Sequence, residues 1–305
     1  MKSLILTLSI CSVLMTSAAK PGPTPVYMSE AEAAGVVPNF KLIGEYLAKS
    51  GGTAVQANLL KDGDFLVATY QGGLPGDGWD QSPIKSEKLA PEALKTLIAG
   101  YAKAERSSPT LGMRAPDGAV LVFPDDFSNI KDGLLMAGGK TLKDLSSFSM
   151  HLEFMQPLKP GKNPSSQDRG NSGIYIFNNY EIQVIDTFAL DYENPDNNAI
   201  KTESLNKQWC GSLYKQKLPD VNMTYPPLRW QTYDIDFQAP EFEGGKKVKN
   251  ARITLFHNGV KVHDDFELKT GTGNGAKKPQ LAKGPVFFQN HGNPVVYRNV
   301  WATEL

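Results

Sequence analysis

Cysteine is scarce in this sequence of 305 residues, which contains only Cys11 and Cys210. Cys11 lies in the first apolar stretch, so a chain without that stretch keeps one cysteine and cannot form an internal disulfide. A single thiol also lacks the partners of a structural zinc site. Stability must therefore come from a buried core, and a chain of this length can bury one.

An excess of one charge is also lacking. The sequence has 32 basic and 32 acidic residues, and loss of a leader containing Lys2 would leave one excess acidic residue. This balance gives no support for a nucleic-acid or anionic-membrane partner. No second long apolar run follows the first one, so we expect a soluble mature protein without a membrane span.

Motifs for several common chemistries are absent. The sequence has no glycine-rich phosphate loop with Lys-Ser/Thr and no HExxH pattern. The run Gly170-Asn171-Ser172-Gly173 does not have the Gly-x-Ser-x-Gly spacing of a serine nucleophile elbow, and no helix is predicted after it. Nucleotide binding, zinc proteolysis and serine hydrolysis are disfavoured, and the sequence names no cofactor.

The amino-terminal stretch has the pattern of a secretory signal peptide. Lys2 precedes an apolar run over residues 4–15, and Ser17 and Ala19 supply the small side chains of a cleavage site. The sequence predicts a signal peptide over residues 1–19, a mature chain beginning at Lys20, and a periplasmic or secreted protein. The alternative is a lipoprotein processed at Cys11, which the bulky Ile10 before it disfavours.

Short strand-like runs separated by Gly, Pro and Asn turns dominate the remaining chain, which favours an antiparallel sandwich or barrel. Helical periodicity is limited to residues 90–105 and, more weakly, 29–35. We expect an accessory region over residues 20–117, with a small β unit and the main helix, and one all-β domain over residues 118–305. The predicted strands are 65–70, 119–123, 148–154, 173–177, 180–186, 232–237, 251–256 and 284–289.

Polar residues recur inside these strand-like runs. Because alternate residues of a strand share a face, the pattern groups Glu181 with Gln183, His151 with Glu153, Gln289 with His291, and Arg298 with Val296 and Val300. Amides and charges on one sheet face could form a sugar-binding surface. The plainer interpretations stay open, namely solvated carboxylates, an Arg298 ion pair, a turn capped by Asp186, and a simple tight turn at 170–173.

Several blocks in order resemble one known family. They are "FSMHLEF", "RGNSGIYIFNNYEIQVIDTF", "CGSLY", "NMTYPPLRWQTYDIDFQAPEF", "ARITLFHNGVKVHDD" and "GPVFFQNHGNPVVYRNVWATEL". Together they are similar to the 3-keto-disaccharide hydrolase domain family over residues 118–305. The region "FKLIGEYLAKSGGTAVQANLLKDGDFLVATYQGGLPGDGW" more loosely resembles a leader that accompanies this domain in planctomycete-like bacteria.

The resemblance implies a concanavalin-A-like jelly-roll β-sandwich that acts on glycosides oxidised at C3. Two positions depart from the family pattern, Asn290 where Asp is common and Trp209 before the Cys-Gly block. The resemblance carries over Asn171, Ser172, Glu181, Gln183, Asp186, Gln289, His291, Arg298 and Asn299, and the strand faces add His151 and Glu153. The predicted catalytic residues are Glu181, Asp186 and His291, and the predicted substrate-binding residues are His151, Glu153, Arg169, Asn171, Ser172, Tyr175, Gln183, Gln289 and Arg298. The base is either Glu181 or Asp186, and the acid is either His291 or His151.

The implied chemistry is an elimination followed by hydration. A ketone at C3 acidifies the C2 proton, a base removes it, and the enolate expels the aglycone from C1; water then completes a net hydrolysis. A divalent metal on these carboxylates is a second way to stabilise the enolate, so the metal content stays open. The competing hypotheses are a non-catalytic carbohydrate-binding module on the same fold and a structural envelope protein.

Overall fold

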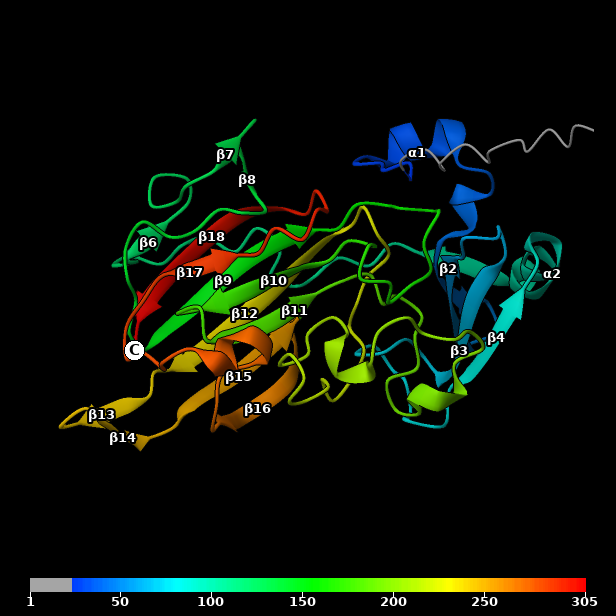
Figure 1. The fold of residues 1–305 in the computed structure, drawn as a ribbon. Helices are drawn as coiled ribbons and strands as arrows, with labels where there is room; N and C mark the ends of the chain where they lie inside the picture. The colour runs from blue at the N-terminus through cyan, green and yellow to red at the C-terminus, as the bar shows by residue number, and fades with distance from the viewer. Residues whose placement is uncertain (1–23) are drawn as a thin grey trace, which may run out of the picture.

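The computed structural model describes residues 24–305. The predicted signal peptide and its cleavage site lie outside the described residues. Figure 1 shows a long β-sandwich beside a smaller β-sheet that contains the amino-terminal strands. Within the described chain, no helix combines the length and the apolar character needed to cross a membrane.

The predicted jelly-roll sandwich is confirmed, and it consists of two antiparallel sheets. The larger sheet has eight strands in the order β16-β15-β12-β9-β18-β8-β7, with β6 paired to β18. Its strands are β6 Leu121–Val122, β7 Ile130–Lys131, β8 Leu134–Met136, β9 Phe148–Met155, β12 Trp230–Gln238, β15 Ala251–His257, β16 Val260–Leu268 and β18 Val296–Glu304.

The smaller sheet has three strands in the order β11-β10-β17. These are β10 Ser172–Ile176, β11 Tyr180–Val184 and β17 Val286–Phe288. A separate hairpin of β13 Glu241–Glu243 and β14 Lys246–Lys249 projects from the end of the sandwich in Figure 1. Each of the eight runs predicted as strands overlaps a strand of the structure.

Alternation along the strands builds the core between the two sheets. Phe148, Met150, Leu152 and Phe154 of β9 are buried in one cluster with the inward side chains of the smaller sheet. That cluster includes the small-sheet residues Ile174, Ile176, Tyr180, Ile182 and Val184. The outward residues of β10 and β11 are therefore free to form a site on the opposite face of the smaller sheet.

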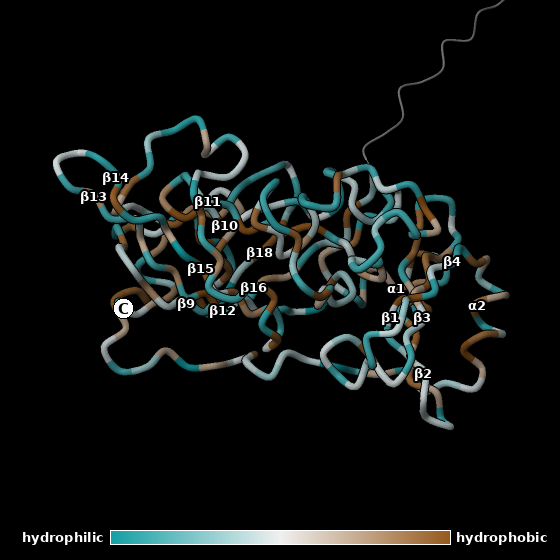
Figure 2. The backbone as a smooth tube through the Cα atoms, turned by 90° about the horizontal axis from the view of Figure 1, so that it is seen from below, coloured by the Kyte–Doolittle hydropathy of each residue, from teal (hydrophilic) through white to brown (hydrophobic). Residues whose placement is uncertain are grey.

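The amino-terminal sheet has five antiparallel strands in the order β4-β3-β2-β1-β5 and its own core. Leu158, Phe188 and Trp209 from the sandwich side belong to this second core. Figure 2 shows hydrophobic (brown) stretches both along the sandwich strands and around β3 and α2. The helices and strands of this amino-terminal region are α1 Glu30–Val36, β1 Gly44–Ala48, β2 Gly52–Leu59, β3 Phe65–Gly72, β4 Lys85–Leu89, α2 Pro91–Leu97 and β5 Tyr101–Ala104.

The helix predicted over residues 90–105 is correct only in its first half. α2 ends at Leu97, and residues 101–104 form strand β5 instead, which pairs with β1. Leu94 is buried and Leu97 and Tyr101 pack on the same core, so the apolar pattern was real. The segment after Gly100 forms hydrogen bonds with the edge of β1 and becomes a strand. Helical periodicity along the sequence cannot show that this edge is available. The helix predicted over residues 29–35 is confirmed as α1, with Ser29 as its N-cap.

The strand parity predicted for Arg298 is wrong after that residue. The pairing of β18 with β9 shifts register between Arg298 and Trp301, and Asn299 has a positive φ of 44°. This is a β-bulge, which reverses the inward and outward assignments beyond it. Val300 consequently lies in the core, whereas Arg298 lies on the outer face of the larger sheet beside Glu153.

A fully buried polar cluster joins the two cores. The Nε of Arg169 donates to Asp186 Oδ2 at 2.6 Å, and its Nη2 donates to Asn58 Oδ1 at 2.8 Å. The amide of Asn58, on β2, also donates to Asp186 Oδ1 at 3.1 Å. All three side chains have zero exposure, so each partner compensates a charge or dipole that burial alone would penalise.

Replacing one partner of this cluster should destabilise the whole fold. We expect Asp186→Asn to lower the free energy of unfolding by about 3–5 kcal/mol, because it leaves the Arg169 guanidinium buried without a counter-charge. Urea unfolding at neutral pH measures the loss. Asp265→Asn is the matched control, since Asp265 pairs with Arg252 and both side chains are partly exposed, and it should leave the free energy of unfolding nearly unchanged. Equal losses in the two variants would contradict the role given to the cluster.

Candidate functional site

A polar pocket opens on the outer face of the smaller sheet. Its volume is about 270 Å³, close to the lower end of the roughly 300–1,000 Å³ typical of small-molecule sites. Strands β10 and β11 form its floor, and loops from four other parts of the chain form its walls. The lining residues are Gln167, Asn171, Tyr175, Glu181, Gln183, Tyr214, Lys215, Gly273, Asn274, Lys277, Gln289 and His291.

The pairing of β10 with β11 sets the floor of this pocket. Tyr175 lies opposite Glu181, and Gly173 lies opposite Gln183. A Cβ atom at position 173 would lie 2.6 Å from Glu181 Oε1, so any side chain there would displace the carboxylate. Glycine at this position therefore leaves the space that Glu181 occupies.

Glu181 is the only carboxylate among the pocket-lining residues in the described part of the chain. Its side chain is 2% exposed, and its Oε2 accepts a hydrogen bond of 2.6 Å from the Tyr175 hydroxyl. Burial raises the pKa of Glu181 to about 7, although Tyr175 and the positive charge of Lys215 act to lower it. Near neutral pH this group can therefore accept or release a proton.

Three amide oxygens of the pocket have no hydrogen-bond partner among residues 24–305, namely Asn171 Oδ1, Gln183 Oε1 and Gln289 Oε1. For two of them the orientation is defined, because Asn171 Nδ2 donates to Gln167 Oε1 at 2.6 Å and Gln183 Nε2 donates to the Gln208 carbonyl at 3.1 Å. Buried acceptors without donors are costly. A ligand with several hydroxyl groups would supply the missing donors.

Close packing around glycines holds the walls against the floor. The 3₁₀ turn η5, Gly273–Lys277, follows Thr272, whose hydroxyl accepts from the Glu181 backbone N–H at 2.7 Å. A Cβ atom at Gly273 would lie 2.8 Å from the Tyr214 ring, and one at Gly275 would lie 2.2 Å from the Asn179 carbonyl oxygen. These approaches place the turn directly beside β11.

Six of the predicted site residues line the pocket together. They are Asn171, Tyr175, Glu181, Gln183, Gln289 and His291. Ser172, another predicted ligand, is fully buried and bonds the Gln289 carbonyl and the Tyr297 hydroxyl instead. Asp186 and Arg169 do not reach the pocket, because they bind each other in the buried cluster described above.

The remaining predicted ligands lie on the outer face of the larger sheet. His151 Nδ1 lies 2.6 Å from Asp234 Oδ1, and Arg298 Nε donates to Glu153 Oε2 at 2.7 Å. Burial opposes ionisation of Glu153, but the His151 ring 3.8 Å away and hydrogen bonds from Asn299, Arg298 and the Gly112 N–H outweigh it and hold its pKa at about 2. None of His151, Glu153 and Arg298 lines the pocket, so the expected convergence of Arg298 with Glu181 on one face does not occur.

The other half of the lining carries almost no signal of a site in its sequence pattern. These residues lie in loops or in a short turn, where the sequence has no helical or strand periodicity from which a shared face could be predicted. They are Gln167, Tyr214, Lys215, Gly273, Asn274 and Lys277. The one available signal was glycine, since Gly271, Gly273 and Gly275 recur within five residues. Such spacing marks a close backbone approach without saying to what.

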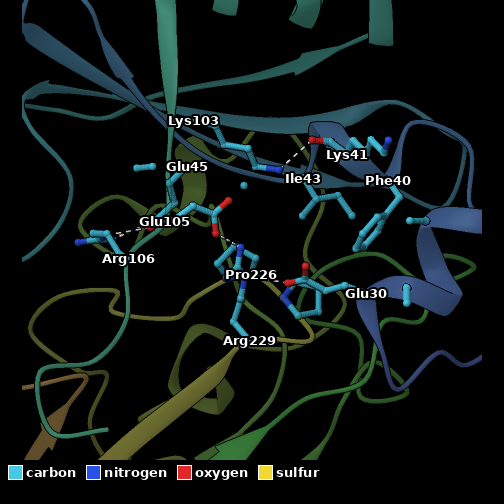
Figure 3. A pocket seen from close by; sticks show the side chains of 15 residues that line it. Glu30, Phe40, Lys41, Ile43, Glu45, Lys103, Glu105, Arg106, Pro226 and Arg229 are labelled. Atoms are coloured by element: carbon cyan, nitrogen blue, oxygen red, sulfur yellow. Dashed lines mark hydrogen bonds and ion pairs between the residues drawn. The ribbon is translucent and has the colours of Figure 1, made fainter.

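A second pocket of about 340 Å³ lies between α1, β1, β5 and residues 226–229 (Figure 3). The three glutamates that line it are all paired with arginine. Arg229 pairs with Glu105 and, at 2.9 Å, with Glu30, and Glu45 pairs with Arg106 at 2.5 Å. None of the unpartnered buried polar atoms identified in residues 24–305 belongs to it, so the pocket on the smaller sheet is the better candidate.

Metal ligands do not cluster in the described part of the chain. No group of three or more His, Cys, Asp or Glu side chains in residues 24–305 is arranged to hold an ion. The side chains that line the pocket provide one carboxylate with a raised pKa, one imidazole, two ammonium groups, two phenols and several amides.

Comparisons with known proteins agree with the family resemblance. Residues 92–303 match a family described as the 3-keto-alpha-glucoside-1,2-lyase-like domain. The match begins within α2, upstream of residue 118, where the sequence analysis began the domain. No curated protein matches the chain.

Three similar solved structures from Parabacteroides distasonis ATCC 8503 are each called a "putative glycosyl hydrolase". One is 26% identical, covers 63% of this chain and 86% of its own, and has a TM-score of 0.49. A second is 18% identical over 58% and 82%, with a TM-score of 0.37. A third is 19% identical over 57% and 88%, also with a TM-score of 0.37.

The family match covers more than half of the chain and includes every residue that lines the pocket. The resemblance predicted from the sequence is thus confirmed: the chain belongs to the family of 3-keto-alpha-glucoside-1,2-lyase-like domains.

Proposed function

We propose that this protein cleaves 3-keto-glycosides by proton abstraction at C2, elimination of the aglycone and hydration, a net hydrolysis. The observation that carries the proposal is the single buried carboxylate of the pocket, Glu181, with its pKa raised to about 7. Family membership supplies the substrate class. The three unpartnered amide oxygens supply acceptors for sugar hydroxyl groups.

One carboxylate suits an elimination better than a direct attack on the acetal. Retaining and inverting glycosidases generally use two carboxylates on opposite sides of the scissile bond. Within the described chain, Glu181 has no second carboxylate beside it in the pocket. A ketone at C3 removes the need for a second one, because it makes the C2 proton acidic enough for a single base.

Each step then has a candidate group. Glu181 removes the C2 proton, and the electron pair moves into the C3 carbonyl to form an enolate. The ammonium group of Lys215 and the Tyr175 hydroxyl lie near enough to Glu181 to stabilise that charge. Collapse of the enolate breaks the bond between C1 and the aglycone oxygen, which His291 at the rim protonates. Water adds across the resulting double bond.

The proposal assigns Asp186 to structure and not to chemistry. Its charge is compensated by Arg169 inside the protein, and none of its atoms lines the pocket. The export predicted from residues 1–19 completes the proposal, with action in the periplasm or outside the cell.

A substrate comparison tests the reaction. We expect cleavage of a 3-keto-α-glucoside and no cleavage of its unoxidised parent, measured by release of the aglycone. Glu181→Gln keeps the shape of the side chain but removes the base, so turnover should fall by about 10²-fold or more. Glu243→Gln, an exposed carboxylate on β13, is the control and should retain wild-type activity.

Loss of activity in Glu181→Gln should not reflect unfolding. A carboxyl group whose pKa is raised by folding stabilises the native state only when protonated, so its contribution is lost as pH rises from about 4.3 toward 7. The variant should therefore be at least as stable as wild type above pH 7. Wild-type turnover by the variant would remove Glu181 from the role of base, and binding of both sugars without turnover would favour a carbohydrate-binding module.

The pH dependence of activity is a separate test. Glu181 acts as a base only when deprotonated, so kcat/KM for the 3-keto-glucoside should fall about tenfold per pH unit below its pKa of about 7. Rates measured between pH 5 and 9 would show this acidic limb. If kcat/KM fell only below pH 4.3, the ordinary pKa of glutamate, the proposed environment of Glu181 would be contradicted.

A further inference from the structure

Two lysines without ion-pair partners stand at the rim of the pocket. Lys215 and Lys277 both line it and are both exposed. Among the ion pairs of residues 24–305, neither side chain takes part in one. The carboxylate that shares the pocket, Glu181, is buried at the floor and bonded to Tyr175. The rim therefore presents positive charge that the protein itself does not neutralise.

The position of Lys215 depends on a strained turn. Its φ is 64°, a left-handed conformation that is unfavourable for a residue with a side chain and is found preferentially at functional sites. The turn is held by hydrogen bonds from the Lys215 N–H to the Lys207 carbonyl at 2.7 Å and from the Leu213 N–H to the Lys217 carbonyl at 3.0 Å. The ammonium group lies 5.3 Å from the centre of the Tyr214 ring. Lys217, only two residues away, pairs with Asp220 instead.

Lys277 reaches the pocket by a different route. It ends the turn η5, which the close approach of Gly275 to Asn179 fixes against β11. Its neighbour Lys278 does not line the pocket. Two independent segments thus bring an ammonium group to the same rim, and one of them does so with a strained backbone.

A neutral disaccharide gives no reason for this arrangement, since amides and hydroxyl groups suffice to bind it. Cations that face a pocket attract and orient an anionic ligand. The enolate can use one of them, and Lys215 is the one close enough to act on the Glu181 carboxyl. Lys277 remains available for a charge on another part of the substrate.

Building on the proposed function, we infer that the pocket selects 3-keto-glycosides whose leaving group carries an anionic oxygen group, a carboxylate or a phosphate, bound by Lys277 together with Lys215. Lysine recognises such groups as a point charge and not by a fixed fork of donors. The enzyme should therefore select the negative charge of the leaving group and not its shape. This preference should weaken as salt screens the exposed ammonium groups.

The test uses three 3-keto-α-glucosides that differ only at the end of the aglycone. The aglycones are 4-hydroxyphenylacetate, 4-hydroxyphenylacetamide and 4-hydroxybenzylphosphonate, whose phenol leaving groups are similar. We expect the wild-type protein to show a kcat/KM about tenfold higher for the two anionic substrates, with the difference mainly in KM. High salt should reduce this ratio toward one, and a carboxylate-to-phosphonate difference would show which anion the rim prefers.

Lys277→Gln should abolish the preference, because it should lower kcat/KM for the two anionic substrates about tenfold more than kcat/KM for the acetamide. Lys278→Gln is the matched control, an adjacent exposed lysine outside the pocket, and it should behave as wild type. Equal kcat/KM for charged and neutral substrates in the wild-type protein would overturn the inference and leave the proposed function intact. A loss of preference in Lys278→Gln as large as in Lys277→Gln would also overturn it.

Calorimetric binding of the three unoxidised α-glucosides separates this inference from the proposed function. If none of the keto substrates is cleaved but the anionic glucosides bind more tightly in a manner that requires Lys277, the proposed reaction fails and the inference stands. If none is cleaved and charge does not affect binding, both fail.

Discussion

The buried contact between Arg169 and Asp186 is the constraint on which the rest of the structure depends. Arg169 lies just before β10 and Asp186 just after β11, so their ion pair closes the ends of the two strands that form the pocket floor. Their backbones are also joined, since the Asp186 N–H donates to the Arg169 carbonyl at 3.1 Å. Asn58 extends the contact to β2 of the amino-terminal sheet. A buried charge pair of this kind contributes more to the specificity of the fold than to its stability. Any arrangement of the three segments that separated Arg169 from Asp186 would leave each charge buried without its partner.

Two carboxylates five residues apart on the chain therefore acquire opposite roles from their surroundings. Asp186 meets a guanidinium, a side-chain amide and the Phe188 N–H, which together satisfy its charge. Glu181 is nearly as buried, but among residues 24–305 its side chain accepts a hydrogen bond from the Tyr175 phenol alone, so burial dominates and its pKa rises to about 7. The first environment holds a carboxylate as a structural anchor, and the second leaves one that can exchange a proton near neutral pH. The distinction comes from neighbours and cannot be seen in the residue type.

The sequence predicted those features that repeat along the chain and missed those that depend on distant partners. Strict alternation identified β9, β12 and β15, and it placed Glu181 and Gln183 on one face. Alternation failed at β18, because the bulge at Asn299 reverses parity. The turn cap predicted for Asp186 is present, since its Oδ1 accepts from the Phe188 N–H, but its contact with Asn58 could not be predicted, because Asn58 lies 128 residues away in sequence. Lys215 and Lys277 reach the pocket from loops, which have no period to read.

The outer face of the larger sheet shows why polar residues on a strand are an ambiguous sign of a ligand site. His151 and Glu153 have the mixture of charge and hydrogen bonding that a sugar would require, yet their partners are internal. The segment after β5 crosses this face, where the Gly112 N–H donates to Glu153 at 2.6 Å and the Met113 carbonyl accepts from Trp301 at 3.1 Å. The connection to the amino-terminal sheet thus occupies hydrogen-bonding groups of Glu153 and Trp301 on this face. Over the smaller sheet, the surrounding loops leave a pocket of about 270 Å³ beside Glu181, and three of its amide oxygens have no donor among residues 24–305. Unsatisfied acceptors, rather than polarity itself, distinguish the face that is open to a substrate.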